Sequence, residues 1–221
     1  MKRFVVLGAA MLALMARPAY ATSITVSSNT SFTVSWLNTV TNPDLSGSAR
    51  FTISNFTNNG FDLLVDQIMN TTPVSPNINA RLVSFGFGLG PDFTTYSNAV
   101  DGAVFSWGFS NFPGFGSVDA CGYAGNNCAG GGNGGLNQGQ SMAGGMSIHF
   151  NGPFGNGVTF SPIAAKFQTG EGSYEFDSTI TNNNTNQNDI SAVPEPASMV
   201  LLGSGLVLAA ARLKRTRQAK S

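Results

Sequence analysis

The chain has 221 residues, and only 10% of them are charged, against roughly a quarter in an average soluble protein. The formal net charge is zero, with 11 basic and 11 acidic side chains, but most basic residues gather at the two ends and most acidic residues lie between them. Residues 22–192 contain three basic and ten acidic side chains, a net charge of −7. A body this acidic should repel phosphate backbones, which argues against nucleic-acid binding.

The first 21 residues have the order of a secretory signal peptide. Two basic residues precede the apolar stretch 4–15, and Ala19-Tyr20-Ala21 then has the small-x-small pattern that signal peptidase accepts. We expect signal peptidase to recognise Ala19 and Ala21 and to cleave after Ala21, so that Thr22 becomes the first residue of the exported protein. The alternative is a buried core helix, which rarely opens with this order of charges.

Between residues 22 and 180 the sequence shows short alternations of apolar and polar residues, the period of half-buried strands. In the first clear example Phe32, Val34 and Trp36 fall on one face. Further segments of this kind follow between turn signals, at 50–54, 61–69, 79–90, 105–109, 146–150, 158–160, 165–169 and 173–180. The segment 61–69 also allows a short helix, but the spacing of its neighbours favours a strand. The pattern predicts an all-β body, an antiparallel β-sandwich or jelly roll.

The segment 79–90 has two unequal faces. Val83, Phe85, Phe87 and Leu89 alternate on an apolar face, while the other face carries Leu82, Ser84 and then glycines at 86, 88 and 90. We expect another strand or loop to pack closely over those glycines. A G-x-G-x-G spacing also suggests a nucleotide site, but neither a Lys-Ser/Thr pair nor a helix pattern follows it. A phosphate-binding loop is therefore not predicted.

Cys121 and Cys128 are the two cysteines of the chain, and both lie in the part predicted to be exported. Oxidising compartments favour a disulfide between them, which would stabilise the fold by about 2–3 kcal/mol. A zinc site needs more ligands than two thiols and the single His149, so we expect no metal and no cofactor. The glycine-rich segment 130–139 follows, and we expect it to be a long surface loop, either a flexible tip or a polar contact surface.

Aromatic residues alternate at Phe105, Trp107 and Phe109. Exposed aromatic rings stack on sugars, which makes Trp107 and Phe109 candidates for carbohydrate contact. The alternative is that this stripe forms half of the sandwich core, which is the more common use of such a pattern.

Three acidic residues, Glu171, Glu175 and Asp177, lie close together in the sequence. Paired carboxylates serve glycoside hydrolysis or calcium binding, but without an accompanying signature a solvated face is favoured. His149 has no Ser or Asp companion at motif spacing, so no hydrolase triad is predicted. We expect that the protein is not an enzyme.

The C-terminal part has segments in a fixed order. An Asn-rich linker at 181–192 precedes Val193-Pro194-Glu195-Pro196, whose prolines favour a stiff, extended backbone. The apolar run 197–211 is shorter than the roughly 20 residues of a full membrane span, but Leu213 and snorkelling of the flanking basic residues extend it, so we expect a transmembrane helix at 197–213. The basic residues of 212–221 place the C-terminus in the cytoplasm. A permanent single-span anchor is the alternative to a temporary one.

Pro194-Glu195-Pro196, the short Gly-containing span and the terminal arginines together resemble the PEP-CTERM sorting signal, over residues 193–217. The resemblance implies that a membrane-embedded exosortase recognises Val193, Pro194, Glu195 and Pro196 and cuts near them through a cysteine nucleophile. Members of this class tend to occur in bacteria that make extracellular polysaccharide and biofilm. A Cys loop followed by a Gly-rich segment is similar to one subgroup.

Together these features predict an exported structural protein of the cell surface or extracellular matrix. Its partners would be signal peptidase, the inner membrane for a limited time, an exosortase and extracellular polysaccharide. The alternatives are a carbohydrate-binding module of the jelly-roll type and, less favoured, a glycosidase.

Overall fold

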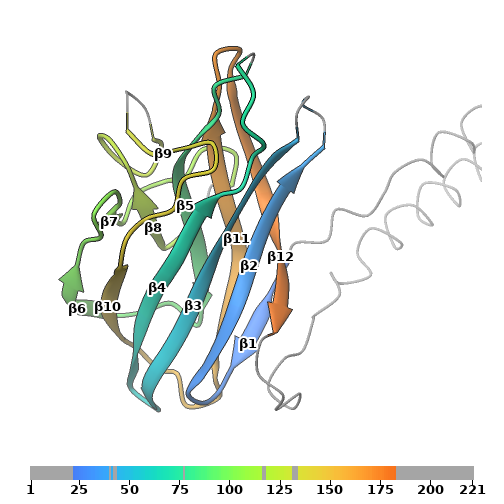
Figure 1. Ribbon diagram of the computed structural model, residues 1–221. Coiled ribbons are helices and arrows are strands. Elements are labelled where there is room, and N and C mark those ends of the chain that lie inside the picture. Colours follow the sequence, from blue (N-terminus) through green and yellow to red (C-terminus); the bar gives the residue numbers. More distant parts are fainter. Residues whose placement is uncertain are drawn as a thin grey trace, which may run out of the picture. The chain divides into compact units, whose positions relative to one another are not determined.

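The computed structural model describes residues 22–39, 41, 44–76, 78–115, 118–130 and 134–182 (Figure 1). The predicted signal peptide, most of the linker and the sorting tail lie outside these residues. The described residues form twelve strands and no helix, so the predicted all-β fold is confirmed. The strands are β1 (Ile24–Val26), β2 (Thr30–Asn38), β3 (Leu45–Thr57), β4 (Gly60–Asn70), β5 (Arg81–Gly90), β6 (Thr95–Val100), β7 (Ser106–Gly108), β8 (Ala120–Tyr123), β9 (Leu136–Asn137), β10 (Gly145–Asn151), β11 (Val158–Gln168) and β12 (Ser173–Asn182).

All strand pairs in the described residues are antiparallel, and ten strands follow one another in the order β6-β10-β4-β3-β2-β12-β11-β5-β8-β7. The remaining two strands add to this path, β1 at β11 and β9 at β5. The path curls into a near-barrel of two layers, with β2, β3 and β4 in front of β11 and β5 in Figure 1. We call the layer of β2, β3, β4, β10 and β6 the front sheet, and the layer of β11, β5, β8 and β7 the back sheet.

Aromatic side chains fill the space between the two sheets. Phe32 and Trp36 are buried on the inner face of β2, as the alternation predicts. Phe51 of β3 makes edge-to-face contacts with Phe85 and Phe87 of β5, with ring centroids 6.4 and 5.6 Å apart. Such contacts add to the stabilisation that burial itself provides, and they join the two sheets across the core.

The two sheets share β12 along one side of the near-barrel. Its residues 173–177 pair with β11, whereas residues 178–182 pair with β2. Where β12 leaves β11, β1 takes its place and pairs with residues 158–160. We call this corner the β12 seam, and Asp177 is the last residue of β12 that pairs with the back sheet.

The sheets meet a second time where β7 of the back sheet comes close to β10 of the front sheet. The indole N–H of Trp107 in β7 donates a hydrogen bond of 2.9 Å to the backbone carbonyl of Ser147 in β10. The backbone N–H of Trp107 donates in turn to Asp101, which follows β6. We call this side the Trp107 seam.

The predicted faces of β5 are correct from residue 84 onwards and wrong before it. Ser84 pairs with Lys166, and Leu82 pairs with the next residue, Phe167, so Val83 is an extra residue in the ladder. A bulge of this kind reverses the alternation. As a result Leu82 belongs to the core, whereas Val83 is buried outside it.

Candidate functional site

The predicted disulfide is present. Cys121 of β8 and Cys128 are joined, with their Cα atoms 5.7 Å apart, and both are buried. They belong to a small second core on the outside of the back sheet, together with Phe112, Val118 and Ala164. The disulfide therefore stabilises this second core, which packs on the outside of the back sheet and which we call the cover.

The expected close packing over the glycines of β5 is found at Gly86 alone. A Cβ atom on Gly90 would have its nearest neighbour, Cβ of Thr159, at 3.9 Å, and Gly88 and Gly90 line a shallow groove. A Cβ atom on Gly86 would lie 2.9 Å from Cδ2 of Phe112 and 3.2 Å from Cγ2 of Val118. Both distances are too short for relaxed contacts, so the loop between β7 and β8 packs directly on the backbone of β5. Packing thus explains the first glycine of the G-x-G-x-G pattern.

The glycine-rich segment is only partly a loop, which corrects the expectation for residues 130–139. Leu136 and Asn137 form β9 and pair with Leu82 and Arg81. The reason is that the Leu136 side chain is buried, and its carbonyl accepts a hydrogen bond of 2.8 Å from the amide of Asn70. This contact ties the segment to the end of β4.

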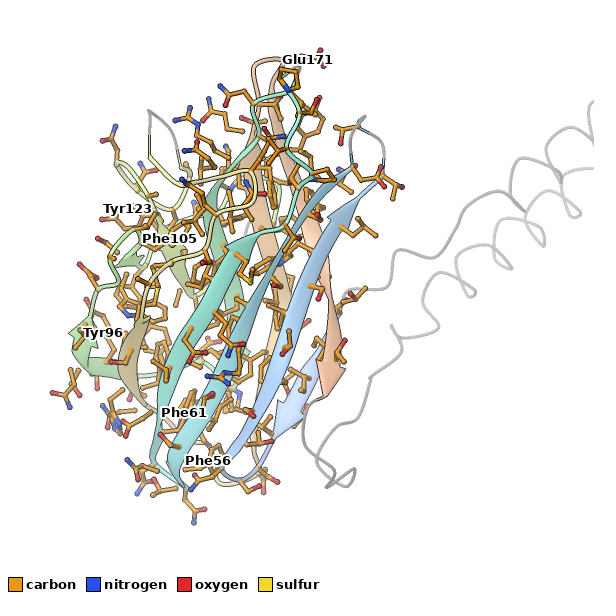
Figure 2. All side chains as sticks on the ribbon, viewed as in Figure 1. Phe56, Phe61, Tyr96, Phe105, Tyr123 and Glu171 are labelled. Atoms are coloured by element: carbon orange, nitrogen blue, oxygen red, sulfur yellow. A yellow bond between two sulfur atoms is a disulfide. The ribbon has the colours of Figure 1, made fainter. Side chains whose placement is uncertain are left out.

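Trp107 and Phe109, the two candidates for sugar contact, have different environments. Trp107 is only 8% exposed and packs edge-to-face on Phe87, which is the core role given above as the alternative. Phe109 is half-buried and stacks on Tyr96 of β6, with ring centroids 3.9 Å apart and planes at 16°. Tyr96 is 46% exposed and lies at the edge of the body in Figure 2. Phe93 contacts both rings, and we call these three residues the β6 aromatic patch.

The three acidic residues near the C-terminal end of the body have separate partners. Glu175 forms an ion pair of 3.0 Å with Lys166, and Asp177 accepts backbone hydrogen bonds at the β12 seam. Burial raises the pKa of Asp177, and the backbone donors oppose this shift. Glu171 lies at the tip of the β11–β12 hairpin (Figure 2). Within the described residues, no group of three or more His, Cys, Asp and Glu side chains has the arrangement of a metal site.

A polar network on the outer face of the front sheet was not predicted. His149 of β10 lies directly opposite Asp62 of β4, with Nδ1 2.5 Å from the carboxylate, and Asn55 donates to the other carboxylate oxygen. Burial pushes the pKa of Asp62 upwards, but the hydrogen bonds from Asn55 and His149 outweigh it, so the pKa is lowered. The sequence does place Asp62 and His149 on outward faces. Their 87-residue separation hides the pairing.

A shallow groove of about 470 Å³ lies on the same outer face, over β3, β4 and the start of β10. The guanidinium of Arg50 makes two hydrogen bonds to Asp66 at its floor, of 2.8 and 2.6 Å. Exposed Leu64 and Met69 lie beside this ion pair. Because the two charges neutralise each other, the groove offers a weakly polar contact surface and no unpaired charge for an ionic ligand.

Comparison with known proteins places one feature at the C-terminal end of the chain. Residues 192–215 match the PEP-CTERM protein-sorting motif, and this range includes Val193, Pro194, Glu195 and Pro196. No curated protein and no solved structure matched the chain. In the residues that the structure describes, no helix is long and apolar enough to cross a membrane.

Proposed function

We propose that this chain, which carries a PEP-CTERM sorting motif, is an exported structural protein of the cell surface or extracellular matrix. The motif match at residues 192–215 is the observation that carries the proposal, because this signal marks exported proteins that an exosortase processes. Signal peptidase would release the N-terminus, the predicted transmembrane helix at 197–213 would hold the precursor at the inner membrane, and the exosortase would then remove this tail.

The body has two properties that support this route. Its disulfide, Cys121–Cys128, is of a kind that persists in oxidising compartments outside the cytoplasm. Its net charge of −7 keeps it soluble and away from anionic surfaces once it is released. Neither property identifies a ligand, so the proposed role is structural.

The sorting step is tested by replacing Pro194-Glu195-Pro196 with three alanines in the full chain. We expect the variant to keep its tail, and therefore to have a higher mass and to remain in the membrane fraction. A matched control replaces Asn186-Gln187-Asn188 in the linker with alanines and should be processed normally. If the first variant has the same mass and location as the unaltered protein, the proposed sorting step is wrong.

A second candidate function is carbohydrate binding through the β6 aromatic patch. The stacked pair of Tyr96 and Phe109 favours it, because one exposed aromatic ring, held rigid by another, is a suitable platform for a sugar ring. Since Trp107 is buried, this proposal assigns the contact to Tyr96 and Phe109.

A pull-down on the producer's own polysaccharide tests this second candidate. Tyr96→Ala should lower retention at least threefold, whereas Val100→Ala should leave it unchanged. Val100 is a matched control because it lies on the same strand and is 57% exposed, but has no aromatic ring. Equal retention of both variants would eliminate the patch as a sugar contact.

We also propose that the body is not a glycosidase. The support is that Glu175 and Asp177 already have partners, while Glu171 lies at a hairpin tip. Incubation of the purified protein with the exopolysaccharide should give no new reducing ends. Release of defined oligosaccharides would contradict this proposal.

A further inference from the structure

The β12 seam collects three backbone N–H groups on a single carboxylate. Asp177 accepts hydrogen bonds from Thr22 (2.7 Å), Ser178 (2.8 Å) and Ile163 (3.2 Å). These donors come from the residues before β1, from β12 itself and from the irregular part of β11, where the register shifts between Phe160 and Ile163. The hydroxyl of Thr22 also donates to the carbonyl of Ser178. Asp177 thus joins the three segments that meet where the sheet changes layer.

The nearest of these three donors is the nitrogen of the bond that signal peptidase is predicted to cleave. Hydrolysis of the Ala21–Thr22 bond adds the hydroxyl of a water molecule to the Ala21 carbonyl and a proton to the Thr22 nitrogen. An α-amino group has an ordinary pKa of about 7.7–8.0, so it takes up a further proton and is mostly an ammonium at neutral pH. Cleavage would therefore create a positive charge 2.7 Å from the Asp177 carboxylate.

We propose that cleavage after Ala21 completes the folded body, because the new α-ammonium of Thr22 forms an ion pair with Asp177 that closes the β12 seam. This inference rests on the proposed export of the chain, since only signal peptidase would generate this terminus. The position of cleavage comes from the Ala19-Tyr20-Ala21 pattern, and the contact of the Thr22 nitrogen with Asp177 gives that position a structural role.

The carboxylate needs such a partner. Asp177 is half-buried, and burial disfavours its charged form, which is why its pKa is raised while Thr22 supplies only a neutral N–H. An ammonium adds a positive charge to that hydrogen bond and makes it an ion pair, and a nearby opposite charge favours the charged form of the carboxylate. The other basic group on the adjoining strands is Lys166, and it already pairs with Glu175. A start shifted by one residue would move the ammonium by roughly 3.5 Å and break the contact.

The test uses the full chain, expressed and processed in the producing cell, with two residues, Gly-Ser, inserted after Ala21. The mature variant then keeps the Thr22 amide but carries its ammonium roughly 7 Å further along the chain. We expect the insertion to raise the equilibrium constant for unfolding in urea by about tenfold. In an Asp177→Asn background the same insertion should change the equilibrium constant for unfolding less than twofold.

Two controls make the result specific. The insertion should keep its tenfold effect in an Asp101→Asn background, because Asp101 accepts a backbone N–H at the opposite seam. Added sodium chloride should reduce the difference between the insertion variant and the unaltered protein, because salt screens an ion pair. This salt measurement decides the matter if the Asp177→Asn protein does not fold.

Several outcomes would overturn the inference. An insertion effect of equal size with and without Asp177 would do so, as would a salt-independent effect or a mature chain that begins at another residue. If the chain begins at Thr22 and shows the coupling but keeps its tail, the proposed sorting step fails while this inference stands. If the chain keeps Met1, the proposed cleavage by signal peptidase fails and this inference fails with it.

Discussion

The two seams of the near-barrel join the same pair of sheets by different means. At the β12 seam a continuous strand changes partner from β11 to β2, so backbone hydrogen bonds and one carboxylate, Asp177, hold the corner. At the Trp107 seam, one indole N–H bridges to the Ser147 carbonyl, and Trp107 packs on Phe87. In a strand ladder many residues each contribute part of the stabilisation, whereas at the Trp107 seam one side chain contributes most of it. We therefore expect the Trp107 seam to be more sensitive to single substitutions.

The largest effect should come from Trp107→Ala. This change removes a buried ring and its hydrogen bond, and we expect a loss of about 3–5 kcal/mol in the free energy of unfolding, measured by urea titration. Trp107→Phe keeps most of the packing but leaves the Ser147 carbonyl unpaired, so its loss should be about 1–3 kcal/mol. A loss below about 1 kcal/mol for Trp107→Ala would show that the seam does not depend on this residue.

The next largest effect concerns the cover of the back sheet, which belongs to neither seam. Replacing both Cys121 and Cys128 with alanine should cost about 2–3 kcal/mol, because the short disulfide loop restricts the unfolded chain. Reduction of the unaltered protein should give a similar loss. The fluorescence of the buried Trp107, measured in a Trp36→Phe background that removes the other tryptophan, should stay the same below the unfolding transition. A shift in that emission would mean that the cover and the Trp107 seam are coupled.

A smaller effect is expected where the cover touches β5. Gly86→Ala places a Cβ atom 2.9 Å from the Phe112 ring, so we expect a loss of about 1–3 kcal/mol as the loop shifts outward. Gly172→Ala is the control, because nothing lies within 4 Å of its Cβ position. Equal stability of the two variants in thermal unfolding would show that the cover can shift away from residue 86 without loss of free energy of unfolding.

The smallest effect belongs to the exposed network on the front sheet. The pKa of Asp62 is lower in the folded protein than its ordinary value of 3.8, so its stabilising contribution is present above that pH and is lost as the pH falls through the lowered pKa. We expect less than about 1 kcal/mol, because the pair with His149 is partly solvated. In urea titrations, the difference in the free energy of unfolding between Asp62→Asn and the unaltered protein should become smaller below pH 3.8. A constant difference at all pH values would exclude this linkage.

The sequence predicts what happens within a strand better than what happens between strands. Alternation correctly placed Phe32, Val34 and Trp36 in the core, because side chains of one strand take opposite faces whatever the partner is. It could not predict the bulge at Val83, since an extra residue in a ladder is defined only by the partner strand. It also predicted two separate segments, 158–160 and 165–169, where β11 is one strand with an irregular register.

The same distinction explains which parts of the candidate sites were foreseen. The disulfide and the sorting motif are local in the sequence, and each was recognised from residues close together in the chain. The β6 aromatic patch and the Asp62–His149 pair combine residues from different strands. Phe109 was identified, but its partner Tyr96 was not, because their stacking depends on how β6 lies relative to the residue that follows β7.

The most direct test of the whole account is the intact mass of the native protein, recovered from the outside of the producing cell. We expect a chain that begins at Thr22, contains one disulfide and ends near Pro194-Glu195-Pro196, without the apolar and basic residues that follow. A protein found in the cytosol with both Met1 and Ser221 present would contradict it.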